Sequence, residues 1–320
     1  MSRSWMIALG VLAAASGCGD DETGPGGSGG IGGNGGVGGG AARACATDID
    51  VGEVQDFGEE SPSTTEGITF DLDDSLYVSA RYLDAGSDDE LLDVSLTGSF
   101  ETAAASESIL GLAAHEDGII AASVATGEVL LIDPSTGGVD VIADGNAAGM
   151  EDPNFVVTTP WGTMLVSDDR VGEDTIYEVT WEGDVSPWVT GVPTPNGMVF
   201  SLDNSTLYVA TTFEEAGLWR VPVNALGEAG TPTKWVAFET KAPDGVAIDS
   251  EGNVYVALNT AGEIAKVDPE GNDTIVASGV RGAASLAFGQ GGFDPCSVYV
   301  TSLFDTQLRR VGIGTLGVEN

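Results

Sequence analysis

Four oxygen-bearing side chains stand at one position of a pattern that recurs along this chain. They are Glu66, Asn154, Asn196 and Asp244, and each leads a short run that predicts a strand. Two carboxylates and two amide oxygens are hard ligands that suit Ca²⁺, with Mg²⁺, Mn²⁺ or Zn²⁺ as substitutes. A divalent cation held there can polarise a carbonyl, and Asp244 could bind it and also serve as general base. The alternative is that Asn196 and Asp244, each followed by glycine, only form turns that enter a strand.

The pattern that carries these residues predicts a β-propeller. Its copies are spaced by 44, 44, 42, 48 and 40 residues, a period typical of propeller blades. The six leading positions are Glu66, Leu110, Asn154, Asn196, Asp244 and Ala284. We therefore predict an all-β fold, a six-bladed propeller of four-stranded antiparallel blades over residues 46–317. Rotation about one axis relates equivalent positions in such a fold, so the four oxygen-bearing side chains should converge on the channel.

Strand polarity also predicts which side chains surround that mouth of the channel. The second strand of each blade returns to the mouth where the leading residues lie, so the ends of these strands line it. Asp168, Asp169 and Thr212 are among these strand ends. The residues that we expect to bind substrate are Arg81, Asn154, Phe155, Phe213 and Asn259.

A serine hydrolase is the competing hydrolytic hypothesis, and the sequence argues against it. The chain has a single histidine, His115, which falls at a predicted turn at the opposite end of the channel. No G-x-S-x-G motif occurs. A Ser-His-Asp triad needs a histidine beside its nucleophile, so such a triad is excluded.

The charge of the chain bears on its partners. It has 50 acidic and 11 basic residues, a formal net charge of −39. Such a chain repels phosphate backbones, so we expect no nucleic-acid partner. The same charge attracts cations to any cleft. The sequence is silent on oligomeric state.

The first 45 residues predict an export signal and a tether. Within residues 1–18 an apolar run of 11 residues starts at Trp5, which is too short to span a bilayer. Small residues before Cys18 resemble a bacterial lipoprotein cleavage site with Cys18 lipidated, and a plain secretory signal is the alternative. Residues 19–45 are rich in glycine and predict a disordered linker. We therefore expect a cell-envelope protein that meets the membrane only through a lipid anchor, or a secreted protein.

Two further cysteines predict a disulfide. Cys45 precedes the first strand of the predicted propeller and Cys296 lies in its last repeat. Propellers often close by adding the N-terminal strand to the final blade, which would bring the two together, and an exported protein meets oxidising conditions. Two unpaired thiols are the alternative.

The repeats resemble the senescence marker protein (regucalcin), gluconolactonase and luciferin-regenerating-enzyme-like propellers. The resemblance rests on the P-N-G run that starts at Pro195 and the P-D-G run that starts at Pro243, each followed by a strand ending in Y-V-A. It covers residues from about 60 to 312. It implies a lactonase whose divalent metal is bound by Glu66, Asn196 and Asp244, with Asn154 beside the metal and Asp244 as base.

Two departures from the family pattern concern the substrate. Phe155 follows Asn154 where many members have aspartate, and Asp152 stands where members that act on sugar lactones have arginine. The loss of a cation and the gain of an aromatic ring favour a more apolar lactone or ester. We therefore predict an exported, metal-dependent lactone or ester hydrolase. The alternative is a non-catalytic envelope propeller that binds a ligand or a protein, with a structural metal.

Overall fold

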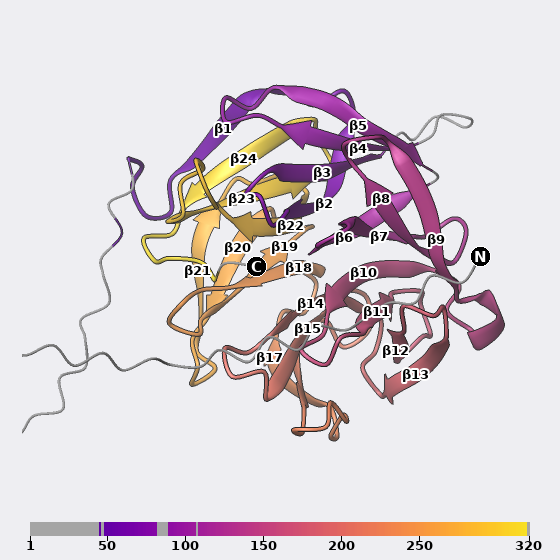
Figure 1. The fold of residues 1–320 in the computed structure, drawn as a ribbon. Coiled ribbons are helices and arrows are strands. Elements are labelled where there is room, and N and C mark those ends of the chain that lie inside the picture. Colours follow the sequence, from indigo (N-terminus) through magenta and orange to yellow (C-terminus); the bar gives the residue numbers. More distant parts are fainter. Residues whose placement is uncertain (1–44, 46–47, 82–88, 107, 319–320) are drawn as a thin grey trace, which may run out of the picture. The chain divides into compact units, whose positions relative to one another are not determined.

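A computed structural model describes residues 45, 48–81, 89–106 and 108–318. All of them belong to one compact unit, residues 42–320. These residues form six four-stranded antiparallel sheets. The sheets follow one another around a common axis (Figure 1). The predicted six-bladed propeller is therefore confirmed. The predictions for Cys18 and for the linker lie outside the described residues.

Strand order in each sheet runs from the axis outward. Blade 1 is β2 (Thr64–Phe70), β3 (Leu76–Arg81), β4 (Asp89–Val94) and β5 (Phe100–Ser106). Blade 2 is β6 (Ile109–His115), β7 (Gly118–Ser123), β8 (Glu128–Asp133) and β9 (Gly138–Asp144). Blade 3 is β10 (Pro153–Thr158), β11 (Met164–Asp168), β12 (Thr175–Val179) and β13 (Val185–Thr190), preceded by the 3₁₀ helix η1 (Asn146–Ala148).

The second half of the chain repeats this order. Blade 4 is β14 (Pro195–Phe200), β15 (Thr206–Thr211), β16 (Gly217–Pro222) and β17 (Thr233–Ala237). Blade 5 is β18 (Pro243–Ile248), β19 (Val254–Leu258), β20 (Glu263–Val267) and β21 (Asp273–Ser278). Blade 6 is β22 (Ala283–Phe288), β23 (Ser297–Ser302), β24 (Gln307–Gly312) and, as its outermost strand, β1 (Val54–Glu60).

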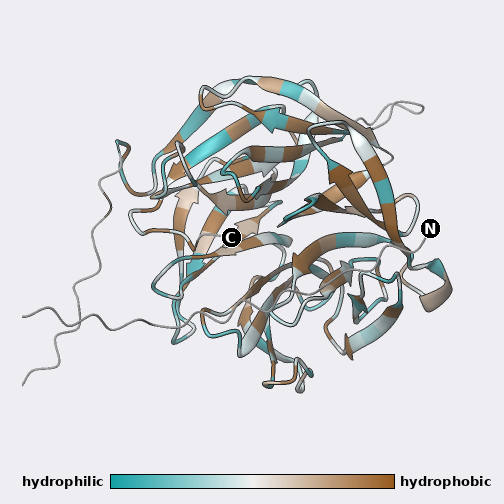
Figure 2. Cartoon of the chain, in the orientation of Figure 1, coloured by the Kyte–Doolittle hydropathy of each residue, from teal (hydrophilic) through white to brown (hydrophobic). Residues whose placement is uncertain are grey.

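The innermost strands form a ring around the axis. Each of β2, β6, β10, β14, β18 and β22 contacts the next, and β22 contacts β2 again. The hydrophobic core lies between successive blades, where buried aliphatic and aromatic side chains of neighbouring sheets pack together. Hydrophobic residues accordingly recur along the strands of all blades (Figure 2). This packing fixes the rotation between blades and so places the leading residues on one level.

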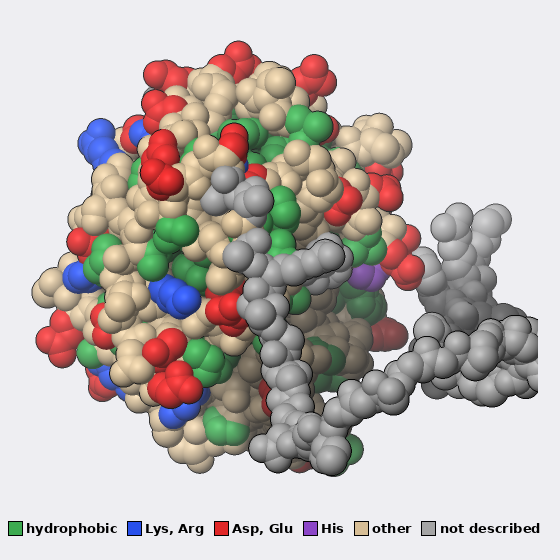
Figure 3. Space-filling model, turned by 90° about the vertical axis from the view of Figure 1, so that its left-hand side faces the viewer, with side chains coloured by type: hydrophobic (Ala, Val, Ile, Leu, Met, Phe, Trp, Pro, Cys, Tyr) green, Lys and Arg blue, Asp and Glu red, His purple; other side chains and the backbone are tan. Residues whose placement is uncertain are grey.

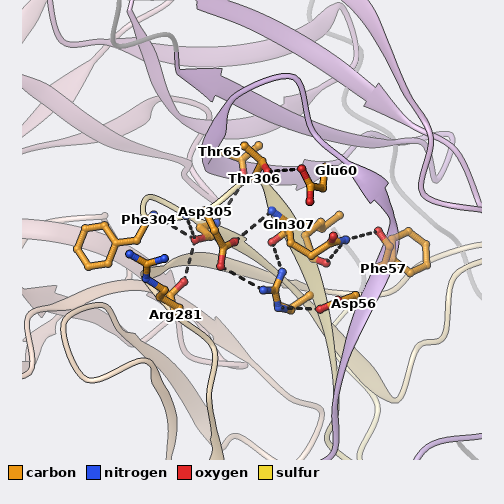
Figure 4. Close-up of polar contacts among 12 residues, drawn as sticks. Asp56, Phe57, Glu60, Thr65, Arg281, Phe304, Asp305, Thr306 and Gln307 are labelled. Atoms are coloured by element: carbon orange, nitrogen blue, oxygen red, sulfur yellow. Dashed lines mark hydrogen bonds and ion pairs between the residues drawn. The ribbon is translucent and has the colours of Figure 1, made fainter.

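The ring closes in blade 6, where both ends of the described chain meet. β1 pairs antiparallel with β24, and Cys45 is joined to Cys296 by a disulfide. Arg309 on β24 makes ion pairs with Asp56 at 3.1 Å and with Asp305 at 3.1 Å (Figure 4). The closure therefore combines a strand pair, ion pairs and a covalent link.

The described surface carries mainly acidic charge. Acidic side chains outnumber basic ones on the face drawn in Figure 3. Within the described residues, no helix is long and apolar enough to cross a membrane.

Candidate metal centre

A β-bulge sets the position of the leading residue in every blade. The register between first and second strands shifts at Thr65/Ile68, Ile109/Leu112, Pro153/Phe155, Pro195/Met198, Pro243/Val246 and Ala283/Leu286. The leading residues fall within these six irregularities. A bulge removes a residue from the ladder and turns its side chain, so the repeat directs one side chain of each blade toward the axis.

Glycine after the leading residue lets neighbouring inner strands approach closely. A Cβ atom on Gly67 would lie 2.0 Å from the Leu110 carbonyl oxygen, and one on Gly197 would lie 2.4 Å from that of Asp244. Gly111 and Gly245 make the same close approach to blades 3 and 6. Only a residue without a side chain fits such a contact between backbones. These glycines therefore belong to the ring and do not merely form turns.

Hydroxyl groups of the second strands bind the backbone that the bulges leave unpaired. Gly67 N–H donates to Ser79 Oγ at 2.7 Å, and Ser79 Oγ–H donates to the Leu110 carbonyl at 2.8 Å. In blade 6, Ser285 N–H donates to Thr301 Oγ1 at 2.9 Å, and Thr301 Oγ1–H donates to the Glu66 carbonyl at 2.5 Å. These hydrogen bonds connect the bulges of blades 1 and 6 to the next blade around the ring.

The four oxygen-bearing leading residues are all buried. Glu66, Asn154, Asn196 and Asp244 are exposed by only 7%, 6%, 3% and 7%. They come from blades 1, 3, 4 and 5. The leading residues of blades 2 and 6 are Leu110 and Ala284, which are apolar and buried. Side chains that could donate an oxygen atom to a cation therefore surround most of the axis, and we call these four residues the ring of donors. The other two blades present apolar side chains.

A second ring of polar side chains contacts the first. In each blade, the residue before the leading position pairs with a residue of the second strand, and the next residue along the chain belongs to this second ring. These residues are Arg81 in blade 1, Asp169 in blade 3, Thr212 in blade 4 and Asn259 in blade 5. Arg81 Nη1 donates to Glu66 Oε2 at 3.0 Å, and Asn259 Nδ2 donates to Asp244 Oδ2 at 3.3 Å. The corresponding residues of blades 2 and 6 are Val124 and Leu303, so the apolar sector extends to this ring.

Asn196 is held by its amide nitrogen alone. Its Nδ2 donates to Thr212 Oγ1 at 3.1 Å and to Asp169 Oδ2 at 3.3 Å. Thr212 Oγ1–H in turn donates to the Pro243 carbonyl at 2.8 Å, which fixes the orientation of the amide. The buried carbonyl oxygen Oδ1 of Asn196 has no hydrogen-bond partner. An unpartnered buried acceptor is costly unless something binds it, and a cation would.

The carboxylates of the site repel one another. Burial, with repulsion from Glu66 and Asp169, raises the pKa of Asp244 well above its usual value. Burial also raises the pKa of Glu66, although Arg81 opposes this shift. Burial, with repulsion from Glu66 and Asp168, raises the pKa of Asp169 to about 7. Three acids destabilise one another in this way where a divalent cation would neutralise them.

Asp169 is the functional candidate that the predicted set of site residues omits. Its position at the end of the second strand could be read from the sequence, as could that of Asp168. The two adjacent acids differ in their contacts: Asp168 Oδ2 accepts the backbone N–H of Glu151 at 2.9 Å and of Asp152 at 3.3 Å, which holds the loop before Asn154. Asp169 instead contacts Asn196 in the next blade. Sequence spacing alone could not separate these two roles.

Two of the predicted substrate-binding residues lie away from the ring of donors. Phe155 lines a cavity of about 530 Å³. The walls of this cavity start one residue beyond the leading position in blade 3 and two residues beyond it in the other blades, and they continue toward the opposite mouth of the channel. Phe213 lies in the loop after β15 and is 59% exposed, with its N–H bonded to Thr194 Oγ1 at 3.1 Å. Phe155 therefore borders the channel on the side of the ring of donors that faces the opposite mouth. Phe213 lies on the outer rim of the mouth where the ring of donors is.

His115 lies at the end of β6 that points away from the ring of donors. Its ring packs against that of Trp181 with centroids 4.2 Å apart and a tilt of 38°, and its Nδ1 accepts the Asp117 N–H at 3.2 Å. Ligand atoms of His115, Glu116 and Asp117 lie within 4.8 Å of one another at this exposed turn. The three residues follow one another at the turn between β6 and β7.

Comparisons with known proteins agree with this architecture. A family model described as the SMP-30/gluconolactonase/LRE-like region matches residues 64–304. Regucalcin of Gallus gallus is 28% identical over 138 residues, which is 42% of this chain and 45% of that protein. The match therefore spans less than half the length of this curated relative.

Solved structures share the fold over most of the chain. A gluconolactonase from Xanthomonas campestris has a TM-score of 0.67 at 16% identity, covering 87% of this chain and 98% of the other. Regucalcin, a calcium-binding protein from Agrobacterium tumefaciens, has a TM-score of 0.66 at 21% identity, covering 81% and 94%. A luciferin-regenerating enzyme has a TM-score of 0.69 at 16% identity, covering 84% and 98%. At these identities the structural matches establish the fold.

Proposed function

We propose that this chain, which belongs to the SMP-30/gluconolactonase/LRE-like family, is a divalent-metal-dependent hydrolase of a lactone or a related ester. The observation that carries the proposal is the unpartnered Oδ1 of Asn196, buried among three mutually repelling carboxyl groups. A gluconolactonase and a calcium-binding regucalcin are among the proteins that share the fold, which supports both the reaction class and Ca²⁺ as the metal.

The residues fit such a cation. Glu66, Asn196 and Asp244 would hold it, with Asn154 beside them. The second-ring hydrogen bonds occupy Oε2 of Glu66 and Oδ2 of Asp244 and leave the other carboxylate oxygen of each outside these contacts. Hydrogen bonds from outside fix metal-binding side chains in this way in many proteins. When bound, the cation would supply Lewis-acid polarisation of a carbonyl group.

Asp244 is the proposed general base. It would take a proton from the water molecule that adds to the carbonyl carbon; the ring C–O bond then breaks and the departing oxygen takes up a proton, which gives a hydroxy acid. Asn259, bonded to both Asp244 Oδ2 and the Gly282 carbonyl, orients this carboxyl group. Arg81, partly exposed and bonded to Glu66, is the cationic side chain that could contact a substrate oxygen.

We also propose export to an oxidising compartment. The disulfide between Cys45 and Cys296 supports this location, because such bonds persist outside the reducing cytosol. Cleavage before Cys18 and its lipidation remain part of the same proposal. Mass spectrometry of the mature chain from envelope fractions would show a diacylated Cys18 if the anchor exists, and an unmodified N-terminus if it does not.

The activity is tested by lactone hydrolysis with and without chelation. We expect turnover of neutral lactones that is lost on treatment with a chelator, restored by Ca²⁺ or another divalent cation, and lost in Asp244→Ala. Asp203→Ala is the matched control, because Asp203 lies in an exposed turn at the opposite end of blade 4. Turnover that survives Asp244→Ala would refute the proposal. Cation binding without turnover of any lactone or ester would favour the non-catalytic binding propeller.

A further inference from the structure

The sector of the mouth formed by blade 6 differs from the rest in chemistry. Its leading residue is Ala284 and its second-ring residue is Leu303, where blades 3, 4 and 5 present acids, amides and a hydroxyl group. Next to Leu303, Phe304 is 48% exposed in the loop between β23 and β24. The side chains that this blade presents near the mouth, Leu303 and Phe304, are therefore apolar.

Arg281 lies beside these two apolar residues, in the loop between β21 and β22. A Cβ atom on Gly282 would lie 2.8 Å from Cβ and Cγ of Phe304, so the aromatic side chain packs directly over the residue next to Arg281. Figure 4 shows Phe304 and Arg281 side by side. Ser302 joins the two loops: its hydroxyl donates to the Arg281 carbonyl at 2.8 Å and accepts the Phe304 N–H at 3.2 Å.

Arg281 stands out among the basic residues that the structure describes. Arg81, Arg170, Lys234, Lys241, Arg309 and Arg310 form ion pairs, and Arg220 lies over the ring of Trp235. Within the same described ranges, Arg281 and Lys266 have neither kind of partner. Arg281 is exposed, and an unpaired arginine is notable in a chain with 50 acidic residues. Its planar fork of donors suits a carboxylate.

The two loops are connected to the candidate metal centre by hydrogen bonds. The Gly282 carbonyl accepts the Leu303 N–H at 3.0 Å and Asn259 Nδ2 at 3.4 Å. Asn259 Nδ2 also donates to Asp244 Oδ2 at 3.3 Å. The side chain of Asn259 thus links the backbone next to Arg281 to Asp244, the carboxylate proposed as general base.

We propose that Arg281 and Phe304 form a subsite, next to the metal centre, for an apolar substituent that ends in a negatively charged group. This inference rests on the proposed function and specifies its substrate class: a lactone or ester that carries a carboxylate on an aromatic or aliphatic substituent. The reacting carbonyl lies at the ring of donors, the apolar part lies along Leu303 and Phe304, and the carboxylate pairs with Arg281.

The test is calorimetric binding of two matched ligands to the full mature protein with saturating Ca²⁺. The ligands are 3-phenylpropanoate and 3-phenylpropan-1-ol, which differ in charge and share the aromatic group. We expect Arg281→Gln to weaken binding of the acid about tenfold and to leave the alcohol unchanged, since a carboxylate loses its charge-assisted hydrogen bonds. Phe304→Ala should weaken both ligands about fivefold, because it removes a shared apolar contact. Lys266→Gln is the matched control and should change neither.

Several outcomes would overturn the subsite. These are no detectable binding of either ligand by the parent protein, Arg281→Gln with no effect on the acid, or an equal loss for acid and alcohol. Because the assay needs no turnover, it separates the two proposals. Arg281-dependent binding in a protein that hydrolyses no lactone would refute the hydrolase and retain the subsite. Hydrolysis combined with indifference to Arg281→Gln would do the reverse.

Discussion

At the scale of residues, the candidate metal centre brings three buried acidic side chains, Glu66, Asp169 and Asp244, close to an unpartnered amide oxygen. Asn196 presents a buried oxygen without a partner, and Arg81 is the basic side chain that contacts a carboxylate of the first ring. Removal of one carboxylate should therefore lower the thermal stability of the protein when a divalent cation is present, and should not lower it when none is present.

Asp244→Asn tests this reversal. With Ca²⁺ present, the variant should bind the ion at least about 100-fold more weakly and lose the stabilisation that ligand binding gives. Without a divalent cation, its thermal midpoint should equal or exceed that of the parent, because a buried repulsive charge is gone. Thermal unfolding in chelator and in Ca²⁺ measures both. A loss of stability of equal size in the two conditions would mean that Asp244 is only structural.

The pKa of Asp169 predicts how the stability of the cation-free protein depends on pH. Burial raises that pKa from 3.8 to about 7, so the folded state binds the proton more tightly than the unfolded state. The stability gained from this proton is complete below the unfolded pKa and is lost as pH rises through about 7. The free energy of unfolding should fall between pH 5 and pH 7 by at most about 1.4 kcal/mol per pH unit from this group. Asp169→Asn should flatten that slope in chelator; an unchanged slope would contradict the assignment.

The four oxygen-bearing leading residues could be picked out from the sequence, since their types and spacing are visible in the repeat, and the structure places each of them, buried, at a bulge of an inner strand. Their role as metal ligands stays a prediction. The sequence did not separate Asp169 from Asp168, because adjacent residues at a strand end have the same spacing and differ only in which loop or blade they face. It also predicted Phe155 as a substrate contact, which stays a prediction; the structure places this side chain in the wall of the channel cavity, one residue after the bulge at Asn154. Such choices depend on local backbone geometry that a repeat pattern does not encode.

At the scale of elements, the bulge and its glycine align the donors. Asn196 and Asp244 lie within inner strands, and not in the turns that the alternative hypothesis gave them. The number and order of strands were predictable from alternating β-branched and turn residues. The bulges were not, because no residue type in the repeat requires the hydroxyl contacts that stabilise them.

Gly197→Ala tests the close approach of inner strands. Its Cβ would lie 2.4 Å from the Asp244 carbonyl oxygen, so blades 4 and 5 must separate. We expect a loss of about 3 kcal/mol in the free energy of unfolding, together with weaker Ca²⁺ binding. Gly162→Ala is the control: φ at Gly162 is +90° but its surroundings are open, so about 1 kcal/mol should be lost with unchanged Ca²⁺ affinity. Equal effects of the two substitutions on Ca²⁺ binding would contradict this account of the ring.

At the scale of the whole molecule, one blade built from both ends of the described chain closes the propeller. The pairing of β1 with β24 and the link between Cys45 and Cys296 hold the two ends together. The two cysteines are 251 residues apart in the sequence. The position of the cysteines in the repeat allowed this pairing to be predicted.

Removal of the disulfide should loosen the closure and leave the metal centre in place. Cys45→Ser combined with Cys296→Ser should lower the free energy of unfolding by up to about 5 kcal/mol, since a cross-link over a long loop restricts the unfolded chain. The Ca²⁺ affinity should change less than about twofold, because the ring of donors lies on other blades. Denaturant unfolding and calorimetry would measure the two effects. A large loss of Ca²⁺ affinity would show that closure itself shapes the site.

The most direct test of the account is calorimetric titration of Ca²⁺ into the chelator-treated protein, with Asn196→Leu measured beside it. Leucine is similar in shape to asparagine and lacks its carbonyl oxygen, so this variant removes the unpartnered acceptor while retaining every acidic residue. The account predicts one site in the parent protein that is lost or weakened at least about 30-fold in Asn196→Leu. Ca²⁺ binding of equal strength in both proteins, or no binding of Ca²⁺, Zn²⁺ or Mn²⁺ to the parent, would contradict it.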